Sequence, residues 1–145
     1  MLAGSKRGPR TTKRRGVPLR RLFTKPGVHP FEEVTWVRCD AVIGSGDRVA
    51  FEQRGIEFPD SWSPNAVNIT AAKYCRGKLG TPEREGSVQQ MVTRVAKTIR
   101  GWGERLGYFA SSAPAQIFED ELTHLLVHQQ AAFNSPVWFN VGTTE

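Results

Sequence analysis

The sequence predicts a mainly α-helical fold with a β-hairpin near its N-terminus. Two observations support this prediction. In the first third of the chain, a Gly-Ser-Gly-Asp cluster interrupts a run of β-branched and aromatic residues, and further on three stretches repeat apolar residues at the spacing of an amphipathic helix. With 145 residues, 39% of them hydrophobic, the chain suits one ordinary domain with its own core.

Residues 1–25 are expected to form a disordered basic arm. They hold nine of the twenty Lys and Arg residues and no acidic residue, whereas the other 120 residues hold eleven basic and fourteen acidic ones. The arm also has few large apolar side chains that could order it. A solvated tail is the simplest interpretation, and a weak contact with nucleic acid or an acidic partner is the functional alternative.

Residues 26–62 are expected to form the hairpin segment. Residues 34–43 and 48–51 have a strand-forming composition, and the glycine cluster at residues 44–47 lies between them. The cluster lacks the strand-to-helix context and the Lys-Ser/Thr pair of a phosphate-binding loop, which favours a hairpin turn.

Residues 63–133 are expected to hold three helices. Ser63 and Pro64 begin the first, which runs towards Gly77, and a capping box of Ser87 and Gln90 begins the second, which ends at residues 101–103. The third begins near Pro114. The apolar stripes, interpreted as core rather than as a cofactor site, are Val67, Thr70, Ala71 and Tyr74; Val88, Met91, Val92, Val95, Ile99 and Trp102; and Ile117, Phe118, Leu122, Leu125, Gln129 and Phe133.

Residues 134–145 are expected to form a strand. Proline disfavours the α conformation in the residue before it, here Ser135, and Val137, Trp138 and Phe139 have high strand propensity. A buried strand without a following partner would leave its hydrogen-bonding groups unpaired, so we expect it to belong to a larger sheet that continues beyond this chain.

The cysteines and histidines do not form a catalytic or metal-binding motif that the sequence alone identifies. Cys39 and Cys75 lie far apart in the sequence and are interpreted as buried free thiols in a reducing cytosol. No apolar run is long enough to cross a membrane. A cytoplasmic protein is therefore predicted. Two histidines four residues apart on a helix can bind one metal ion, and His124 and His128 have this spacing, with Asp120 one turn earlier. Ordinary helix histidines are favoured, because the neighbouring glutamate of the zinc-protease motif is missing.

Several motifs occur in one collinear order that is typical of a known family. They are Phe-Thr-Lys-Pro-Gly-Val-His-Pro-Phe at 23–31, Val-Ala-Phe-Glu-Gln at 49–53, Asp-Ser-Trp-Ser at 60–63, Lys-Tyr-Cys-Arg-Gly at 73–77, Thr-Pro-Glu-Arg-Glu at 81–85, Gly-Tyr-Phe at 107–109, His-Gln at 128–129 and Phe-Asn-Ser-Pro-Val-Trp-Phe-Asn-Val-Gly at 133–142. Over about residues 22 to 145, the chain resembles the N-terminal region of class II, adenosylcobalamin-dependent ribonucleotide reductases.

The resemblance implies a helical N-terminal region that leads into a ten-stranded α/β barrel, with residues 134–145 as the first barrel strand. It implies reduction of ribonucleotides, most commonly diphosphates in this subgroup, to 2′-deoxyribonucleotides for DNA synthesis and repair. Adenosylcobalamin bound by the barrel would supply the radical chemistry, through a thiyl radical on a barrel cysteine. The implied partners are the remaining barrel, a thioredoxin-type dithiol reductant and further copies in a homo-oligomer.

Ser135 is the one site residue that the resemblance assigns. It matches the serine of the Asn-Ser-Pro motif that contacts the substrate near its phosphate end, and a hydroxyl can donate and accept there. A simple turn former before proline is the plain alternative.

The chain also departs from the family pattern. It ends before the family's first redox cysteine, and neither Cys39 nor Cys75 matches a catalytic cysteine, so we expect the chain alone to be inactive. It could be a gene fragment, a piece with an artificial boundary or one part of a split reductase. The alternative function is a non-catalytic helical module that binds nucleic acid or an acidic partner through its arm.

Overall fold

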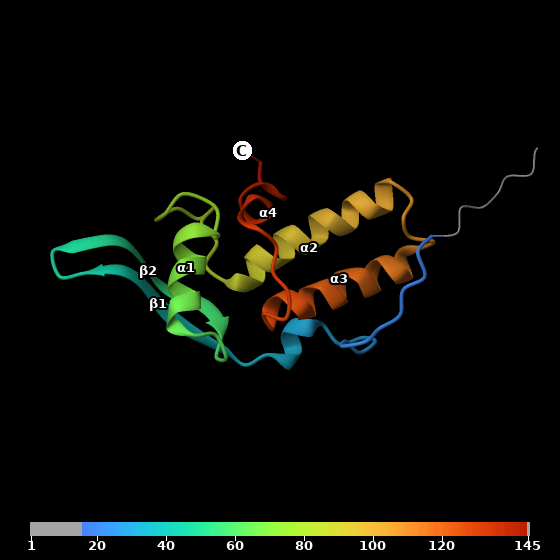
Figure 1. The fold of residues 1–145 in the computed structure, drawn as a ribbon, viewed down its shortest axis with the longest axis horizontal. Coiled ribbons are helices and arrows are strands. Elements are labelled where there is room, and N and C mark those ends of the chain that lie inside the picture. The colour runs from blue at the N-terminus through green and yellow to red at the C-terminus, as the bar shows by residue number, and fades with distance from the viewer. Residues whose placement is uncertain (1–15, 145) are drawn as a thin grey trace, which may run out of the picture.

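Within residues 16–144, the fold combines one antiparallel hairpin with four α-helices, whose arrangement Figure 1 shows. The computed structural model describes residues 16–144. A short 3₁₀ helix, η1 (Pro30–Glu33), comes before strands β1 (Trp36–Ser45) and β2 (Arg48–Pro59). Helices α1 (Pro64–Lys73), α2 (Val88–Arg105), α3 (Ser112–Val127) and α4 (Ser135–Asn140) follow. The predicted hairpin followed by helices is confirmed.

The hairpin turns at the predicted glycine cluster. Ser45 pairs with Arg48, which leaves Gly46 and Asp47 as a two-residue loop, and Gly46 has a φ of 56° that glycine tolerates without steric cost. The second strand is longer than predicted and carries a bulge, where the Asp40 carboxylate accepts the Gly55 N–H at 2.8 Å.

Helices α1 and α2 begin where the sequence predicts. Ser63 caps α1 by accepting the Ala66 N–H at 3.2 Å, and Ser87 caps α2 by accepting the Gln89 N–H at 3.0 Å. The predicted capping box is displaced by one residue, because the Gln90 side chain accepts from Gly86 rather than from Ser87. Both helices end away from their predicted ends: α1 at Lys73, before Gly77, and α2 at Arg105, beyond residue 103.

Helix α3 is shorter than predicted and buries a different face. It ends at Val127 because Gln129 takes a φ of 54° and the N–H groups of Gln130 and Ala131 turn back to the Leu125 carbonyl. Its buried residues do not coincide with the predicted stripe and include two carboxylates; they are Ala115, Glu119, Asp120, Thr123, Leu126 and Val127. The carboxylates can be buried because arginines from other segments pair with them.

The prediction of a strand at residues 134–145 is wrong, since residues 135–140 form helix α4. Asn134 is the extended residue, with φ −69° and ψ 162°, and it serves as the N-cap. Pro136 then lies in the first helical turn, where its missing N–H leaves no bond unmade. The strand propensity of residues 137–139 is a weak local preference that these start signals and tertiary contacts outweigh.

The N-terminal segment also differs from its prediction. Residues 16–25, expected within the disordered arm, run along α3 in Figure 1, while residues 1–15 lie outside the described part. The Val17 N–H donates to the Tyr108 carbonyl at 2.8 Å, and Thr24 is only 7% exposed. Side chains of α3 therefore order a stretch whose composition alone predicts disorder.

The core lies where the hairpin and helices α1 to α4 meet. Its buried residues are Ala41, Ile56 and Phe58 from the hairpin, Val67, Ala71 and Cys75 from α1 and the residues after it, Val88, Met91, Val92 and Val95 from α2, Leu126 from α3 and Trp138 from α4. Trp102, predicted as core, is 41% exposed. None of the helices in residues 16–144 has the length and apolar character that crossing a membrane requires.

Candidate functional site

Ser135 lies at the first residue of α4, half-buried against the end of α1. Its Oγ is 3.1 Å from the phenol oxygen of Tyr74, the C-cap residue of α1. The two residues are 61 positions apart. The family motif predicted Ser135, whereas no local signal in the sequence predicted Tyr74 as its neighbour.

Aromatic side chains surround this hydroxyl pair. The Tyr74 ring stacks on Phe139 with centroids 5.6 Å apart, and the Arg76 guanidinium lies 5.2 Å from the centre of the same Phe139 ring. The ring centroid of Trp138 lies 6.4 Å from that of Tyr74, and the Trp138 indole N–H donates to the Phe133 carbonyl at 3.0 Å. The N-terminal turn of α4 is thus packed rather than free.

Arg94 of α2 holds the other end of α4. Its Nη1 donates to the carbonyls of Val141 at 2.7 Å and Trp138 at 3.1 Å, where the negative end of the helix dipole favours a cation. Its Nε donates to Glu85 at 2.7 Å, and the second Glu85 oxygen accepts the Arg76 N–H at 2.8 Å. One buried ion pair therefore joins α2, α4 and the loop after α1.

Arg84 fixes the same loop from the other side. Its guanidinium donates to the carbonyls of Ala71 at 2.6 Å, Cys75 at 2.7 Å and Gly77 at 3.2 Å. Cys75 is a free thiol with 1% exposure, and burial, followed by the nearby Glu85 charge, raises the pKa of this thiol to about 12. Cys75 is therefore a packing residue, as predicted, whereas Cys39 is only partly buried.

His124, His128 and Asp120, the candidate metal ligands, do not point to a common site. His124 and His128 lie close, with ring centroids 4.3 Å apart, but Asp120 is paired with Arg21 instead. No three His, Cys, Asp or Glu side chains in residues 16–144 are arranged to hold a metal ion. His124 stacks on Phe23 at 5.2 Å, and burial, together with the His128 charge, lowers its pKa.

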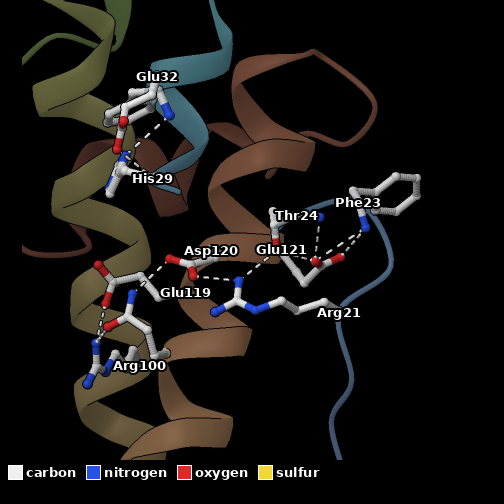
Figure 2. A network of polar contacts seen from close by, with 11 residues as sticks. Arg21, Phe23, Thr24, His29, Glu32, Arg100, Glu119, Asp120 and Glu121 are labelled. Carbon is white, nitrogen blue, oxygen red and sulfur yellow. Dashed lines mark hydrogen bonds and ion pairs between the residues drawn. The ribbon is translucent and has the colours of Figure 1, made fainter. Parts of the chain in front are cut away.

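A second polar network involves α3, and Figure 2 labels its members Arg21, Arg100, Glu119 and Asp120. Arg21 binds Asp120 at 2.7 Å, and Arg100 of α2 binds Glu119 at 2.8 Å. A glutamine on α3, Gln116, joins the two pairs by accepting from the arginine of α2 and donating to the aspartate, both at 2.7 Å. This network fastens the N-terminal segment and α2 to α3.

Glu121 completes the attachment of the N-terminal segment. Its carboxylate accepts the backbone N–H groups of Phe23 at 3.0 Å and Thr24 at 2.9 Å, and also the Thr24 hydroxyl, as the dashed lines in Figure 2 mark. Burial alone would raise the pKa of Glu121, but these hydrogen bonds together lower it. The role of this network is structural.

The chain matches the family model described as class II vitamin B12-dependent ribonucleotide reductase over residues 40–129. A vitamin B12-dependent ribonucleotide reductase of Streptomyces avermitilis is 54% identical over 147 residues, covering 99% of this chain and 15% of the relative. The corresponding Streptomyces coelicolor protein is 52% identical over 145 residues, again 99% of this chain and 15% of the relative, and that of Rhodopirellula baltica is 44% identical over 118 residues, 80% of this chain and 11% of the relative.

The chain belongs to the class II vitamin B12-dependent ribonucleotide reductase family and corresponds to the N-terminal portion of these proteins. It spans 15% of the length of the Streptomyces relatives. The family implies a cobalamin cofactor.

Proposed function

We propose that this chain is the N-terminal part of a reductase that converts ribonucleoside diphosphates to 2′-deoxyribonucleoside diphosphates for DNA synthesis and repair. The family match over residues 40–129 supports this proposal more than any other observation. In it, a barrel cysteine forms the thiyl radical, a thioredoxin-type dithiol supplies electrons, and the enzyme works as a homo-oligomer in the cytoplasm. The chain alone is inactive, because neither of its cysteines takes part.

Ser135 is the proposed substrate contact. Its hydroxyl sits at the first turn of α4, on a helix fixed at both ends by Tyr74 and Arg94. A hydroxyl held in this way can hydrogen-bond a phosphate oxygen with little loss of conformational freedom. This role does not depend on the predicted strand, since Ser135 begins helix α4 instead.

We assign no cobalamin contact to the described residues. The corrin ring already surrounds the cobalt with nitrogen ligands, so a protein adds at most an axial ligand, and His124 is instead packed against Phe23 at 5.2 Å and His128 at 4.3 Å between ring centroids. The cofactor, proposed as adenosylcobalamin, is assigned to the remaining part of the longer reductase, where it would supply the radical chemistry.

A complementation assay tests the proposal. The part of the Streptomyces avermitilis reductase that follows the matched segment is combined with this chain, adenosylcobalamin, a dithiol and a ribonucleoside diphosphate. Deoxynucleotide formation should exceed that of either polypeptide alone. Formation no greater than that of the partner polypeptide alone would contradict the proposal, once circular dichroism shows that this chain is folded.

The basic-arm alternative gains no support from the described residues. Of its positive side chains, Arg21 pairs with Asp120 and Lys25 with Glu33, so both are engaged within the chain. The remaining prediction, a salt-dependent nucleic-acid contact through the first fifteen residues, concerns residues outside the described part.

A further inference from the structure

We infer that Tyr74 is a positioning residue for Ser135, acting through its phenol hydroxyl on the serine hydroxyl; the inference rests on the proposed substrate contact. The two oxygens are 3.1 Å apart, within hydrogen-bond distance. Each hydroxyl has one proton to donate, so the hydroxyl that accepts this bond keeps its own proton available for a ligand.

The direction of this bond follows from the chemistry of the two groups. A phenol is a stronger hydrogen-bond donor than an aliphatic alcohol, so Tyr74 donates to the Ser135 oxygen. The serine proton then stays free to point away from α1. A phosphate oxygen carries negative charge and only accepts hydrogen bonds, which makes it the group that this free proton suits.

Tyr74 can fix this orientation because it is itself held. Its ring stacks on Phe139 at 5.6 Å with an interplanar angle of 27°, and its backbone N–H donates to the Thr70 carbonyl at 2.9 Å. Its carbonyl accepts from Arg94 at 3.4 Å, the same arginine that holds the last carbonyls of α4. Arg94 therefore links the backbone of Tyr74 to the C-terminal carbonyls of the helix that carries Ser135, so the packed structure sets the separation of the two hydroxyls.

The test is a double-mutant cycle in a full-length reductase. Residues 1–145 of this chain replace the matching segment of the Streptomyces avermitilis reductase, and Tyr74→Phe, Ser135→Ala and the double variant are compared. For each, the Kd of a ribonucleoside diphosphate is measured at equilibrium, together with kcat and KM in the presence of adenosylcobalamin and a dithiol.

We expect Ser135→Ala to raise Kd and KM about tenfold or more, as for a lost hydrogen bond to a charged group. Tyr74→Phe should raise both by about two- to tenfold and change kcat less than about twofold. The double variant should be no weaker than Ser135→Ala alone, because the phenol acts only through the serine.

A matched control comes from Tyr108, the second of two tyrosines in the sequence, which is 57% exposed. Tyr108→Phe removes the same hydroxyl and should leave Kd, KM and kcat unchanged. Tyr74→Phe keeps the stacked ring, so the variant should stay folded at the assay temperature despite the lost hydrogen bond, which thermal unfolding checks.

The outcomes separate the inference from the proposed function. If Ser135→Ala weakens binding while Tyr74→Phe has no effect, or if the two effects multiply in the double variant, the positioning role is overturned and the substrate contact stands. If Ser135→Ala leaves binding unchanged, the substrate contact itself is overturned, and the positioning role with it.

Discussion

At the scale of single residues, Arg94 makes a set of stabilising contacts that no motif in the sequence predicts. It donates to Glu85 and to the carbonyls of Trp138 and Val141, so one side chain fastens the helix that carries Ser135. The exposed fractions of the Arg94 and Glu85 side chains are only 12% and 10%. Removing the arginine would leave a buried carboxylate without its counter-charge.

Arg94→Met should therefore lower the free energy of unfolding by about 3–5 kcal/mol, the usual cost of breaking a buried ion pair from one side. Urea denaturation followed by circular dichroism measures it. The matched control is Arg54→Met, since Arg54 and its partner Glu52 are 77% and 40% exposed. That change should cost much less, because an ion pair exposed to water contributes little to stability. Equal losses for the two variants would contradict a dominant role for Arg94.

At the scale of elements, the caps of the helices offer a comparison within one chain. Ser63 caps α1 by accepting the Ala66 N–H, whereas Ser111, at the same position of α3, makes no capping hydrogen bond with its side chain. Ser63→Ala should cost about 1 kcal/mol of stability. Ser111→Ala should stay within about 0.5 kcal/mol. Thermal unfolding of both variants measures the difference, and a larger loss at Ser111 would contradict the assignment.

These elements also show what could be predicted from the sequence. The hairpin turn and the starts of α1 and α2 depend on local chemistry at residues 44–47, Ser63 and Ser87, and all were predicted. The form of α4 and the buried face of α3 were not, because Arg94, Arg100 and Arg21 reach them from distant segments. At the site, the family motif predicted Ser135, but Tyr74 is brought to it only by packing across 61 positions.

At the scale of the whole molecule, hydrogen bonds to α3 attach the N-terminal segment. Glu121 accepts from Phe23 and Thr24, residues 98 and 97 positions away, and its pKa is lowered because these bonds outweigh the effect of burial. An unfolded glutamate takes up its proton near the ordinary pKa of 4.5, whereas the folded Glu121 does so only at lower pH. The stabilisation is thus complete above pH 4.5 and is lost as pH falls through the lowered folded pKa.

Acid should therefore release this segment before the core. Amide hydrogen exchange followed by NMR should show that protection factors at Phe23 and Thr24 fall as pH drops below 4.5, while amides in the middle of α2 stay protected. Glu121→Gln cannot ionise, so its protection at these two residues should already be lower at pH 7 and should not change with acid. Constant protection of Phe23 and Thr24 down to pH 3, or identical behaviour of Glu121→Gln, would show that the carboxylate does not hold the segment.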